Sequence, residues 1–238
     1  MHLKRIPPFI ALLLVPYVAF TQNFGLKEYR GELGAALGAT TYFGQIGGGT
    51  NTYRGNFGFY YRKIMSDHIA VRINYEYIPL GAKDSISSNP EIRQRGFEFF
   101  RPFHDIGFSL EYFFKSQELR YHSIHFNPYI GIGMSYILNV PNDYNNFKTY
   151  KFRIEKLQDQ YAPIATIPLN LGFQYSLKNN LIVFSEITYR YTTADIIDNF
   201  GNSDAITTKN GTFKPAKNGN DRFVSYKIGI SRSIVKKY

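Results

Sequence analysis

The chain has 238 residues, of which 44% are hydrophobic and 19% are charged, and its formal net charge is +10. These proportions exclude a disordered chain and fit a domain with a sizeable core, while the charge indicates an anionic partner or surface. Cysteine is absent, which excludes disulfides, thiolate metal sites and an acyl-cysteine anchor.

The N-terminus predicts an export signal. Three basic side chains stand within residues 2–5, and residues 6–20 form a short apolar run that three prolines interrupt. Such a run is too short and too broken to favour a spanning helix, so it favours a signal peptide over the alternative of a retained single anchor. We therefore expect residues 1–22 to direct export through the general secretory route and residues 23–238 to form a single domain.

Eight segments after this signal alternate apolar and polar residues with a period of two. Ile69 and Ile73, for example, lie on one face of a predicted strand, and Arg72 and Glu76 lie on the other. Each segment has about the length that crosses a bilayer as a tilted strand, roughly 9–11 residues. The predicted strands are residues 32–40, 56–64, 68–78, 105–114, 127–138, 166–176, 181–191 and 223–233.

The polar faces of these strands are dominated by small residues, such as Gly34, Gly58 and Gly131. Glycine has no rationale on an exposed strand, whereas small residues inside a narrow barrel leave room for long side chains. The few charges on these faces are nearly balanced, which predicts an enclosed ion-pair network. The predicted lumen network contains Arg62, Arg72, Glu76, Glu111, Glu186, Arg190 and Lys227, with Glu32 on the same face. We therefore expect lipid against the apolar faces.

The connections between the predicted strands alternate in length. Residues 65–67 and 177–180 are tight turns and residues 115–124 are intermediate. The long polar connections are residues 43–55, 79–98, 139–165 and 193–222. This alternation is typical of outer-membrane barrels with periplasmic turns. The predicted fold is all-β: an eight-stranded antiparallel transmembrane outer-membrane β-barrel with long extracellular loops and both termini in the periplasm.

Two stretches outside the strands suggest local motifs. Residues 44–50, GQIGGGT, lack the Gly-Lys-Ser/Thr ending of a phosphate-binding loop, so we interpret them as a hairpin loop. Residues 150–162 place Tyr150, Ile154 and Leu157 at helical spacing. A short amphipathic helix over the barrel mouth and an irregular loop both fit this pattern.

The residues that could carry chemistry are few. His104, Asp105 and Ser109 suggest a hydrolase or lipid-A enzyme at the barrel rim, but no nucleophile–base–orienter set is visible. We expect no catalytic site, cofactor or metal. Nucleic acid is not an expected partner of an exported barrel. The basic residues of the long loops suit the phosphates of outer-membrane lipid and lipopolysaccharide.

Most of the mature chain, roughly residues 30–235, resembles a known family. The stretches that carry the resemblance are ELGAALGATTYFGQI (32–46), RGFEFF (95–100) with HDIGFSLEYFF (104–114), FNPYIGIGMSYI (126–137) and residues 168–200. They are similar to the PorG-like outer-membrane barrels of the type IX secretion system of the Bacteroidetes. Gln45 replaces a usual Asp, and Ala194 and Ile196 replace Thr-Asp-Tyr-like residues, which leaves open a divergent paralogue with another partner.

The resemblance implies a non-enzymatic role. Such barrels are held to associate with a periplasmic ring, built from a lipoprotein and its partner subunit, and to tie the secretion or gliding machinery to the outer membrane. A ring in the periplasm reaches only the termini and the turns, so we expect the contacts at Lys115, Arg120 and Tyr121 in the longest turn. A stand-alone adhesin or stability barrel and, less favoured, a lipid-modifying enzyme are the alternatives.

Overall fold

The computed structural model describes residues 28–44, 46, 52–96, 98–117, 125–139, 163–177, 180–193, 197, 206–208, 211–213 and 220–237. The predicted signal peptide, the glycine-rich loop after Ile46, residues 150–162, Arg120 and Tyr121 lie outside these ranges.

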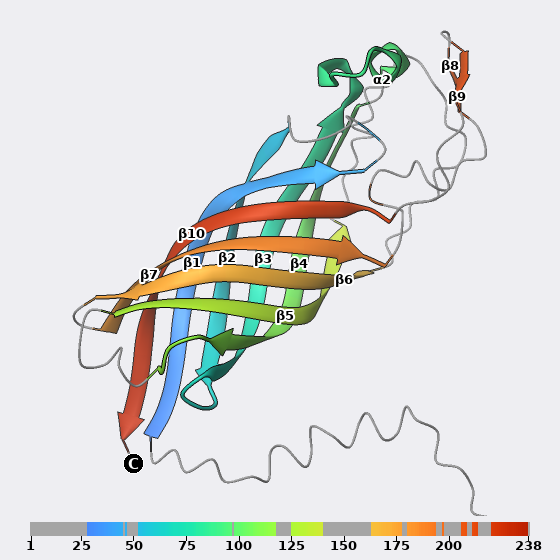
Figure 1. Ribbon diagram of the computed structural model, residues 1–238. Coiled ribbons are helices and arrows are strands. Elements are labelled where there is room, and N and C mark those ends of the chain that lie inside the picture. Colours follow the sequence, from blue (N-terminus) through green and yellow to red (C-terminus); the bar gives the residue numbers. More distant parts are fainter. Residues whose placement is uncertain are drawn as a thin grey trace, which may run out of the picture.

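Eight long strands close into one antiparallel barrel in the order β1-β10-β7-β6-β5-β4-β3-β2 (Figure 1). The barrel strands are β1 (Glu28–Phe43), β2 (Tyr53–Ile64), β3 (Ile69–Lys83), β4 (Glu98–Phe113), β5 (His125–Asn139), β6 (Ile164–Ser176), β7 (Leu181–Thr192) and β10 (Arg222–Lys237). The other elements are η1 (Asp84–Ile86), α2 (Pro90–Arg95) and a two-stranded sheet of β8 (Ile206–Thr208) and β9 (Gly211–Phe213). The predicted eight-stranded antiparallel barrel is therefore confirmed.

The register of the strands sets the tilt of the barrel. Paired residues lead once round the wall from Gly31 through Lys63, Val71, Leu110, Ile132, Leu169, Tyr189 and Val224 to Thr41. The circuit therefore returns to β1 ten residues beyond its start, which is the shear of the barrel. With a rise of about 3.3 Å per residue and a strand spacing of about 4.8 Å, this shear gives a tilt of about 40°.

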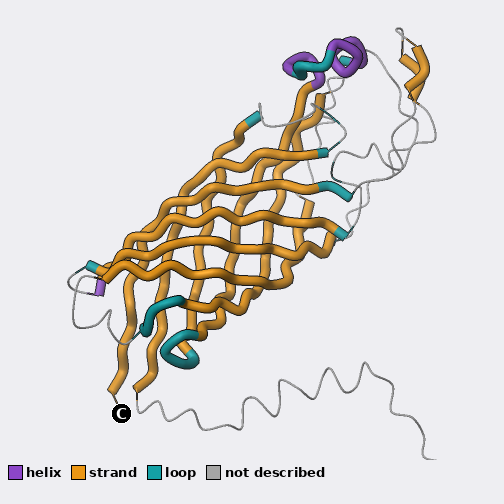
Figure 2. The backbone as a smooth tube through the Cα atoms, viewed as in Figure 1, coloured by secondary structure: helices purple, strands orange, loops and turns teal. Residues whose placement is uncertain are grey.

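The two ends of the barrel differ in the way that the connections predict. The tight turn between β2 and β3 closes through hydrogen bonds from the backbone N–H groups of Met65 and Ser66 to the carbonyl oxygen of Ile69, 2.9 and 3.1 Å long. It lies at the same end as the start of β1 and the end of β10, whereas η1 and α2 lie at the opposite end (Figures 1 and 2). We call these the turn end and the loop end.

β3 and β4 are longer than the sequence indicated. Residues 79–98 were expected to form a loop, but β3 continues to Lys83 and β4 begins at Glu98, so that expectation is wrong at both ends. Pro79 and Pro102 face each other in this extension, beyond the residues that pair β2 with β3 and β4 with β5. A proline is tolerated there because no neighbouring strand needs its missing N–H group.

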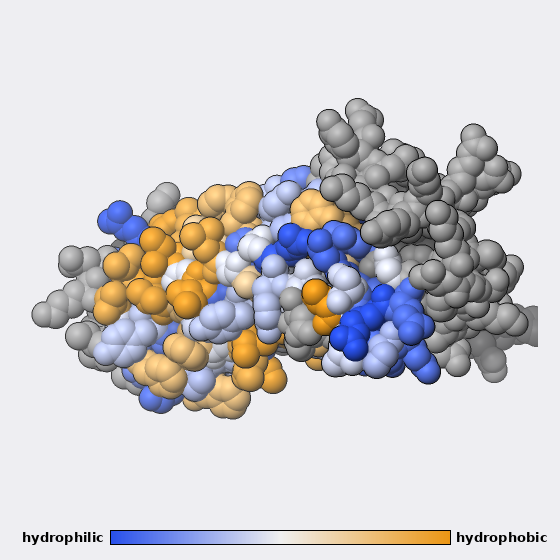
Figure 3. Space-filling model, turned by 90° about the horizontal axis from the view of Figure 1, so that it is seen from above, coloured by the Kyte–Doolittle hydropathy of each residue, from blue (hydrophilic) through white to orange (hydrophobic). Residues whose placement is uncertain are grey.

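The barrel is polar inside and apolar outside. Leu37 is 71% exposed and Ile132 is 55% exposed on the outer wall, whereas Arg62 and Glu111 are 0% exposed in the lumen. Hydrophobic residues gather on the wall, and hydrophilic residues gather toward the loop end (Figure 3). This is the surface of a barrel that spans a membrane, because the outer wall could not stay exposed in water.

Aromatic side chains border the apolar wall at both ends. Near the turn end, the ring of His68 stacks on Tyr112 at a centroid distance of 5.8 Å. Toward the loop end, His104 stacks on Tyr75 at 5.7 Å, and its Nδ1 atom lies 2.7 Å from the Tyr75 hydroxyl. These two pairs, both on the β3–β4 side of the wall, stand at the two levels where a membrane barrel is expected to carry aromatic girdles.

Within the described ranges, no helix is long and apolar enough to cross a membrane.

Candidate functional site

Nine buried charged side chains form one continuous chain of ion pairs along the lumen. In order, the ion-pair chain runs Glu32, Arg62, Glu111, Arg72, Glu186, Lys227, Glu76, Arg190 and Asp105, and its eight N–O distances lie between 2.5 and 3.0 Å. Each of the four cations contacts two carboxylates, so the sign of the charge alternates. Arg62 stands near the turn end of β2 and Arg190 near the loop end of β7, so the chain spans most of the lumen.

Five of these eight contacts cross the lumen between strands that are not neighbours. Arg72 on β3 contacts Glu186 on β7 at 2.6 Å, and Lys227 on β10 contacts Glu76 on β3 at 2.6 Å. Arg190 on β7 contacts both Glu76 and Asp105 on the opposite wall. The seven charges predicted for the lumen therefore lie together, and the ion pairs brace the barrel across its width.

Two tyrosines complete the coordination of the carboxylates. The Tyr60 hydroxyl donates to Glu32 Oε1 at 2.5 Å, and the Tyr129 hydroxyl donates to Glu186 Oε2 at 2.8 Å. Both rings also flank the Arg62 guanidinium, whose carbon lies 4.9 and 5.2 Å from their centroids. Such contacts are favourable for a desolvated cation, so the rings offset part of the cost of burying Arg62.

Glycines make the space that these rings occupy. A Cβ atom on Gly34 would lie 2.4 Å from Tyr60 Cε1, and one on Gly172 would lie 2.6 Å from Tyr129 Cζ. Because real Cβ atoms do not approach so closely, the rings fit only against a bare backbone. The small residues of the lumen face are therefore matched to particular large ones.

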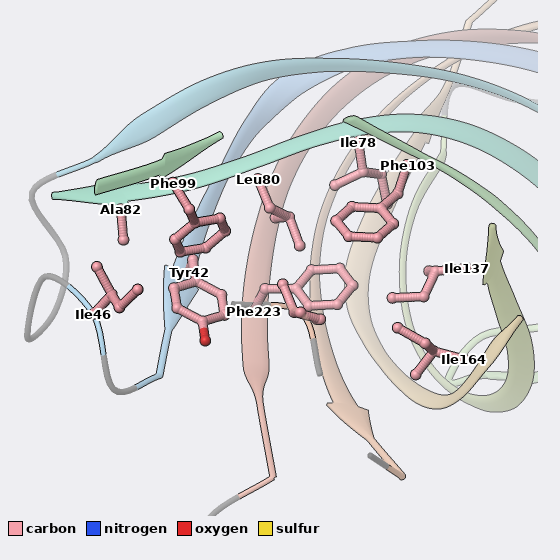
Figure 4. Close-up of a cluster of buried hydrophobic side chains, with 11 residues drawn as sticks. Tyr42, Ile46, Ile78, Leu80, Ala82, Phe99, Phe103, Ile137, Ile164 and Phe223 are labelled. Atoms are coloured by element: carbon pink, nitrogen blue, oxygen red, sulfur yellow. The ribbon is translucent and has the colours of Figure 1, made fainter. Parts of the chain in front are cut away.

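The loop end of the lumen is filled by apolar side chains. The cluster contains Tyr42, Ile46, Ile78, Leu80, Ala82, Phe99, Phe103, Ile137, Ile164, Ile197 and Phe223 (Figure 4). Ile197, from the connection after β7, is held there by its backbone: its N–H donates to Asp221 Oδ2 at 2.8 Å and its carbonyl accepts from Arg101 at 3.3 Å. The Tyr42 hydroxyl donates to the same aspartate.

The turn end is filled in a different way. Ile64, Ala70, Phe113 and Tyr129 form a second buried cluster there. Beyond it, the amide of Gln174 donates to the Gln117 side chain at 3.1 Å, and Gln117 is fully buried. Side chains therefore occupy the lumen at both ends as well as in the middle.

A void in the middle of the lumen is too small for a ligand. It lies against Arg72, Phe184 and Lys227 and has a volume of about 10 Å³. That is the lower limit for a single water molecule. Around this void, the described side chains hold the walls of the lumen together and leave no room for a solute or a substrate.

The structure separates the three residues that suggested a rim enzyme. His104 lies on the outer wall, whereas Asp105 points into the lumen and contacts Arg190 at 2.9 Å. Ser109 also lies in the lumen and is buried. Adjacent strand residues point to opposite faces, so His104 and Asp105 cannot act on one substrate. The structure therefore does not bring these three side chains together as a catalytic set.

One of the three predicted partner contacts lies in the described ranges. Lys115 is exposed at the turn end after β4, and its backbone is fixed by Asn127, which accepts from the Lys115 N–H at 3.0 Å and donates to its carbonyl at 2.8 Å. Gln117 continues this turn beside the β2–β3 turn, because its N–H donates to the Asp67 carbonyl at 2.7 Å.

A family model matches residues 10–230 of the chain, and its description is "Domain of unknown function (DUF6089)". The chain belongs to the DUF6089 family. No curated protein sequence matches it.

Solved structures similar to this DUF6089 barrel include OprG of Pseudomonas aeruginosa, with a TM-score of 0.47 and 15% identity over 87% of this chain and 95% of that one. The N-terminal barrel domain of OprF from Pseudomonas aeruginosa has a TM-score of 0.45 and 8% identity over 86% and 97%. Ail of Yersinia pestis, crystallised with the heparin analogue sucrose octasulfate, has a TM-score of 0.39 and 10% identity over 87% and 98%. These likenesses are too distant to indicate what the DUF6089 barrel does.

Several lumen residues of the DUF6089 barrel were missed from the sequence. Asp105 ends the ion-pair chain, and its alternation with Ile106 already places it on the inward face of its strand. Tyr129 follows the same parity as Gly131 and Gly133. Gln117 lies beyond the last strand residue of β4, where no periodic signal could have placed it in the lumen.

Proposed function

We propose that this protein is a non-enzymatic outer-membrane barrel that anchors a periplasmic ring complex of the type IX secretion and gliding machinery. The filled lumen is the observation that carries this proposal. The described side chains that occupy it at the turn end, in the middle and at the loop end support a role outside the lumen rather than transport or catalysis inside it. The function then belongs to the surfaces that the barrel presents on either side of the membrane.

The resemblance to PorG-like barrels supports a partner on the periplasmic side. In outer-membrane barrels the short turns and both termini face the periplasm, and here the start of β1, the end of β10 and the β2–β3 turn share the turn end (Figure 1). The turn that begins at Lys115 is the longest connection at that end. It carries Arg120 and Tyr121, residue types that are enriched in energetically important protein contacts.

A complementation experiment tests the anchor. We expect Arg120→Glu combined with Tyr121→Ala to abolish the release of secreted cargo in a deletion strain, while heat-modifiable migration shows a folded barrel. The periplasmic lipoprotein and its partner subunit should co-purify with the parent protein and be lost from the double variant. His104→Ala is the matched control, because His104 lies on the outer wall, and it should support normal secretion.

Two results would contradict the anchor. One is normal secretion from the double variant. The other is a parent protein that purifies without ring subunits after mild solubilisation and chemical crosslinking.

A stand-alone binding barrel is the second candidate, and the long β3–β4 hairpin favours it. These strands remain paired from Pro79–Pro102 to Lys83–Glu98, beyond the residues that pair β3 with β2 and β4 with β5, and carry α2. α2 is itself well defined, because the Asn89 side chain accepts from the Glu91 N–H at 2.9 Å and Gly96 follows at φ 72°. Replacing residues 84–97 with Asn-Gly should leave secretion intact if the protein is an anchor, and should abolish surface binding if this candidate is right.

A further inference from the structure

The outer wall carries an apolar groove that climbs obliquely from the turn end. Its volume is about 620 Å³. It is lined mainly by Leu33, Ala35, Phe59, Ile73, Ile106 and Leu181, with Arg232 at one extremity. The groove therefore crosses from the first residue of β7 over β10, β1 and β2 to β3 and β4.

A small residue on β1 creates the hollow. Ala35 faces outward between two large neighbours, because the register pairs it with Phe59 on β2 and with Ile230 on β10. Ile230 is 58% exposed and Phe59 is 57% exposed, so both rise above the alanine. The floor of the groove is fixed by the backbone ladder of three strands, so the hollow does not depend on one side-chain rotamer.

A cation marks the turn end of this groove. Arg232 pairs with Leu181, the first residue of β7, and with Leu33 on β1, so it stands at the membrane boundary. Its side chain is exposed on the same outward face as Ile230. Within the described part of the chain, no acidic side chain pairs with Arg232. Lys63 on β2, opposite Gly31 on β1, is a second exposed cation at the turn end, and β1 separates its strand from that of Arg232.

We propose that this groove binds one glycerophospholipid with an anionic headgroup, drawn from the leaflet on the turn side of the membrane. An acyl chain lies along Ala35 between Phe59 and Ile230, and the phosphate accepts hydrogen bonds from the Arg232 guanidinium. Arginine suits this role because its planar fork matches phosphate oxygens, and Lys63 adds positive charge nearby.

The charge distribution favours this occupant over a second copy of the chain. Among the described residues that line the groove, most of the exposed surface is apolar, and the charged one, Arg232, stands at the end that meets the headgroups. That pattern complements an amphiphile with an anionic head and an apolar tail. A second copy would present another apolar wall and would leave Arg232 without an anion.

Native mass spectrometry of the detergent-solubilised full chain tests the site. The probes are phosphatidylglycerol and phosphatidylcholine with identical acyl chains, titrated separately. We expect the parent to bind one phosphatidylglycerol, and to bind it at least about tenfold more tightly than phosphatidylcholine, as a charge-assisted contact implies. Arg232→Gln should remove that preference, whereas Ala35→Trp should fill the groove and weaken the binding of both lipids.

Two control variants make the result specific. Arg222→Gln removes an exposed cation at the loop end of the same strand, and Leu171→Trp adds bulk to the outer wall of β6, outside the groove. Both should bind like the parent. Lipids that add without saturation, alike in all variants, would show annular lipid only and would overturn the proposal, as would a lipid-free dimer.

Discussion

Arg72 lies between two carboxylates from different walls of the barrel, Glu111 at 3.0 Å and Glu186 at 2.6 Å. Replacing it by leucine leaves both carboxylates buried without their cation. We expect Arg72→Leu to lower the free energy of unfolding by roughly 3–5 kcal/mol, the cost typical of breaking a buried ion pair. Urea unfolding of the refolded barrel in detergent or lipid measures this difference.

Ser109 is the matched control for that experiment. It is directly opposite Arg72 on β4 and equally buried, but its hydroxyl has no hydrogen-bond partner in the described part of the chain. Ser109→Ala should therefore leave the urea midpoint unchanged or raise it slightly. If Arg72→Leu and Ser109→Ala unfold at the same urea concentration, the ion-pair chain does not stabilise the barrel.

Gly172 tests whether close packing in the lumen, and not only charge, stabilises the barrel. An alanine there would place its Cβ 2.6 Å from Tyr129 Cζ and 2.9 Å from the Ser185 carbonyl. We expect Gly172→Ala to cost roughly 1–3 kcal/mol of unfolding free energy through overpacking. Gly55→Ala is the comparison, because its Cβ would meet nothing nearer than 3.9 Å, and it should be tolerated. Equal stability of the two variants would contradict a matched glycine–tyrosine packing.

At the level of strands, alternation in the sequence predicts the barrel but not its ends. A period of two reports which face a residue occupies, so it is sufficient to group the inward charges. Strand ends depend on whether the neighbouring strand is still paired, which no local pattern records. In the sequence, Pro79 and Pro102 therefore suggest strand ends. In the structure they pair with each other, beyond the residues that pair β3 with β2 and β4 with β5.

For the candidate site, the sequence likewise predicts which side chains face the lumen but not which of them are in contact. Parity assigns Arg62, Arg72 and Glu186 to the lumen, but it does not show which carboxylate each cation contacts. Those contacts depend on the shear, which brings Arg72 on β3 within 2.6 Å of Glu186 on β7. Gln117 follows from neither parity nor shear, because it reaches the lumen from a turn.

The orientation of the barrel can be read from single cysteines, because the chain contains none of its own. We expect Thr207→Cys, on β8 in the connection between β7 and β10, to react in intact cells with an impermeant maleimide. Ser66→Cys, in the turn after β2, should react only after the outer membrane is opened. Labelling of Ser66→Cys in intact cells would reverse the assignment of the turn end to the periplasm.

For the whole molecule, a filled lumen predicts that the barrel does not conduct ions. We expect the purified protein to insert into planar bilayers without sustained conductance, because side chains block the path at both ends and in the middle. Insertion is verified independently by protease protection and heat-modifiable migration. Stable open-channel currents from the inserted protein would show that the apolar cluster at the loop end moves aside, and the anchor proposal would lose its main support.

The cross-lumen contacts also have a consequence for how the barrel is made. Glu76 and Asp105 are opposite each other on β3 and β4, but Arg190 on β7 reaches them across the lumen only when the last strand joins the first. Until that moment their charges remain hydrated, so an open sheet gains nothing from them. Closure of the barrel then removes water from these charges and pairs them in one step. Partly assembled barrels therefore gain no stability from the ion pairs. Biogenesis should accordingly appear all-or-none, with half-closed intermediates too short-lived to accumulate for proteolysis.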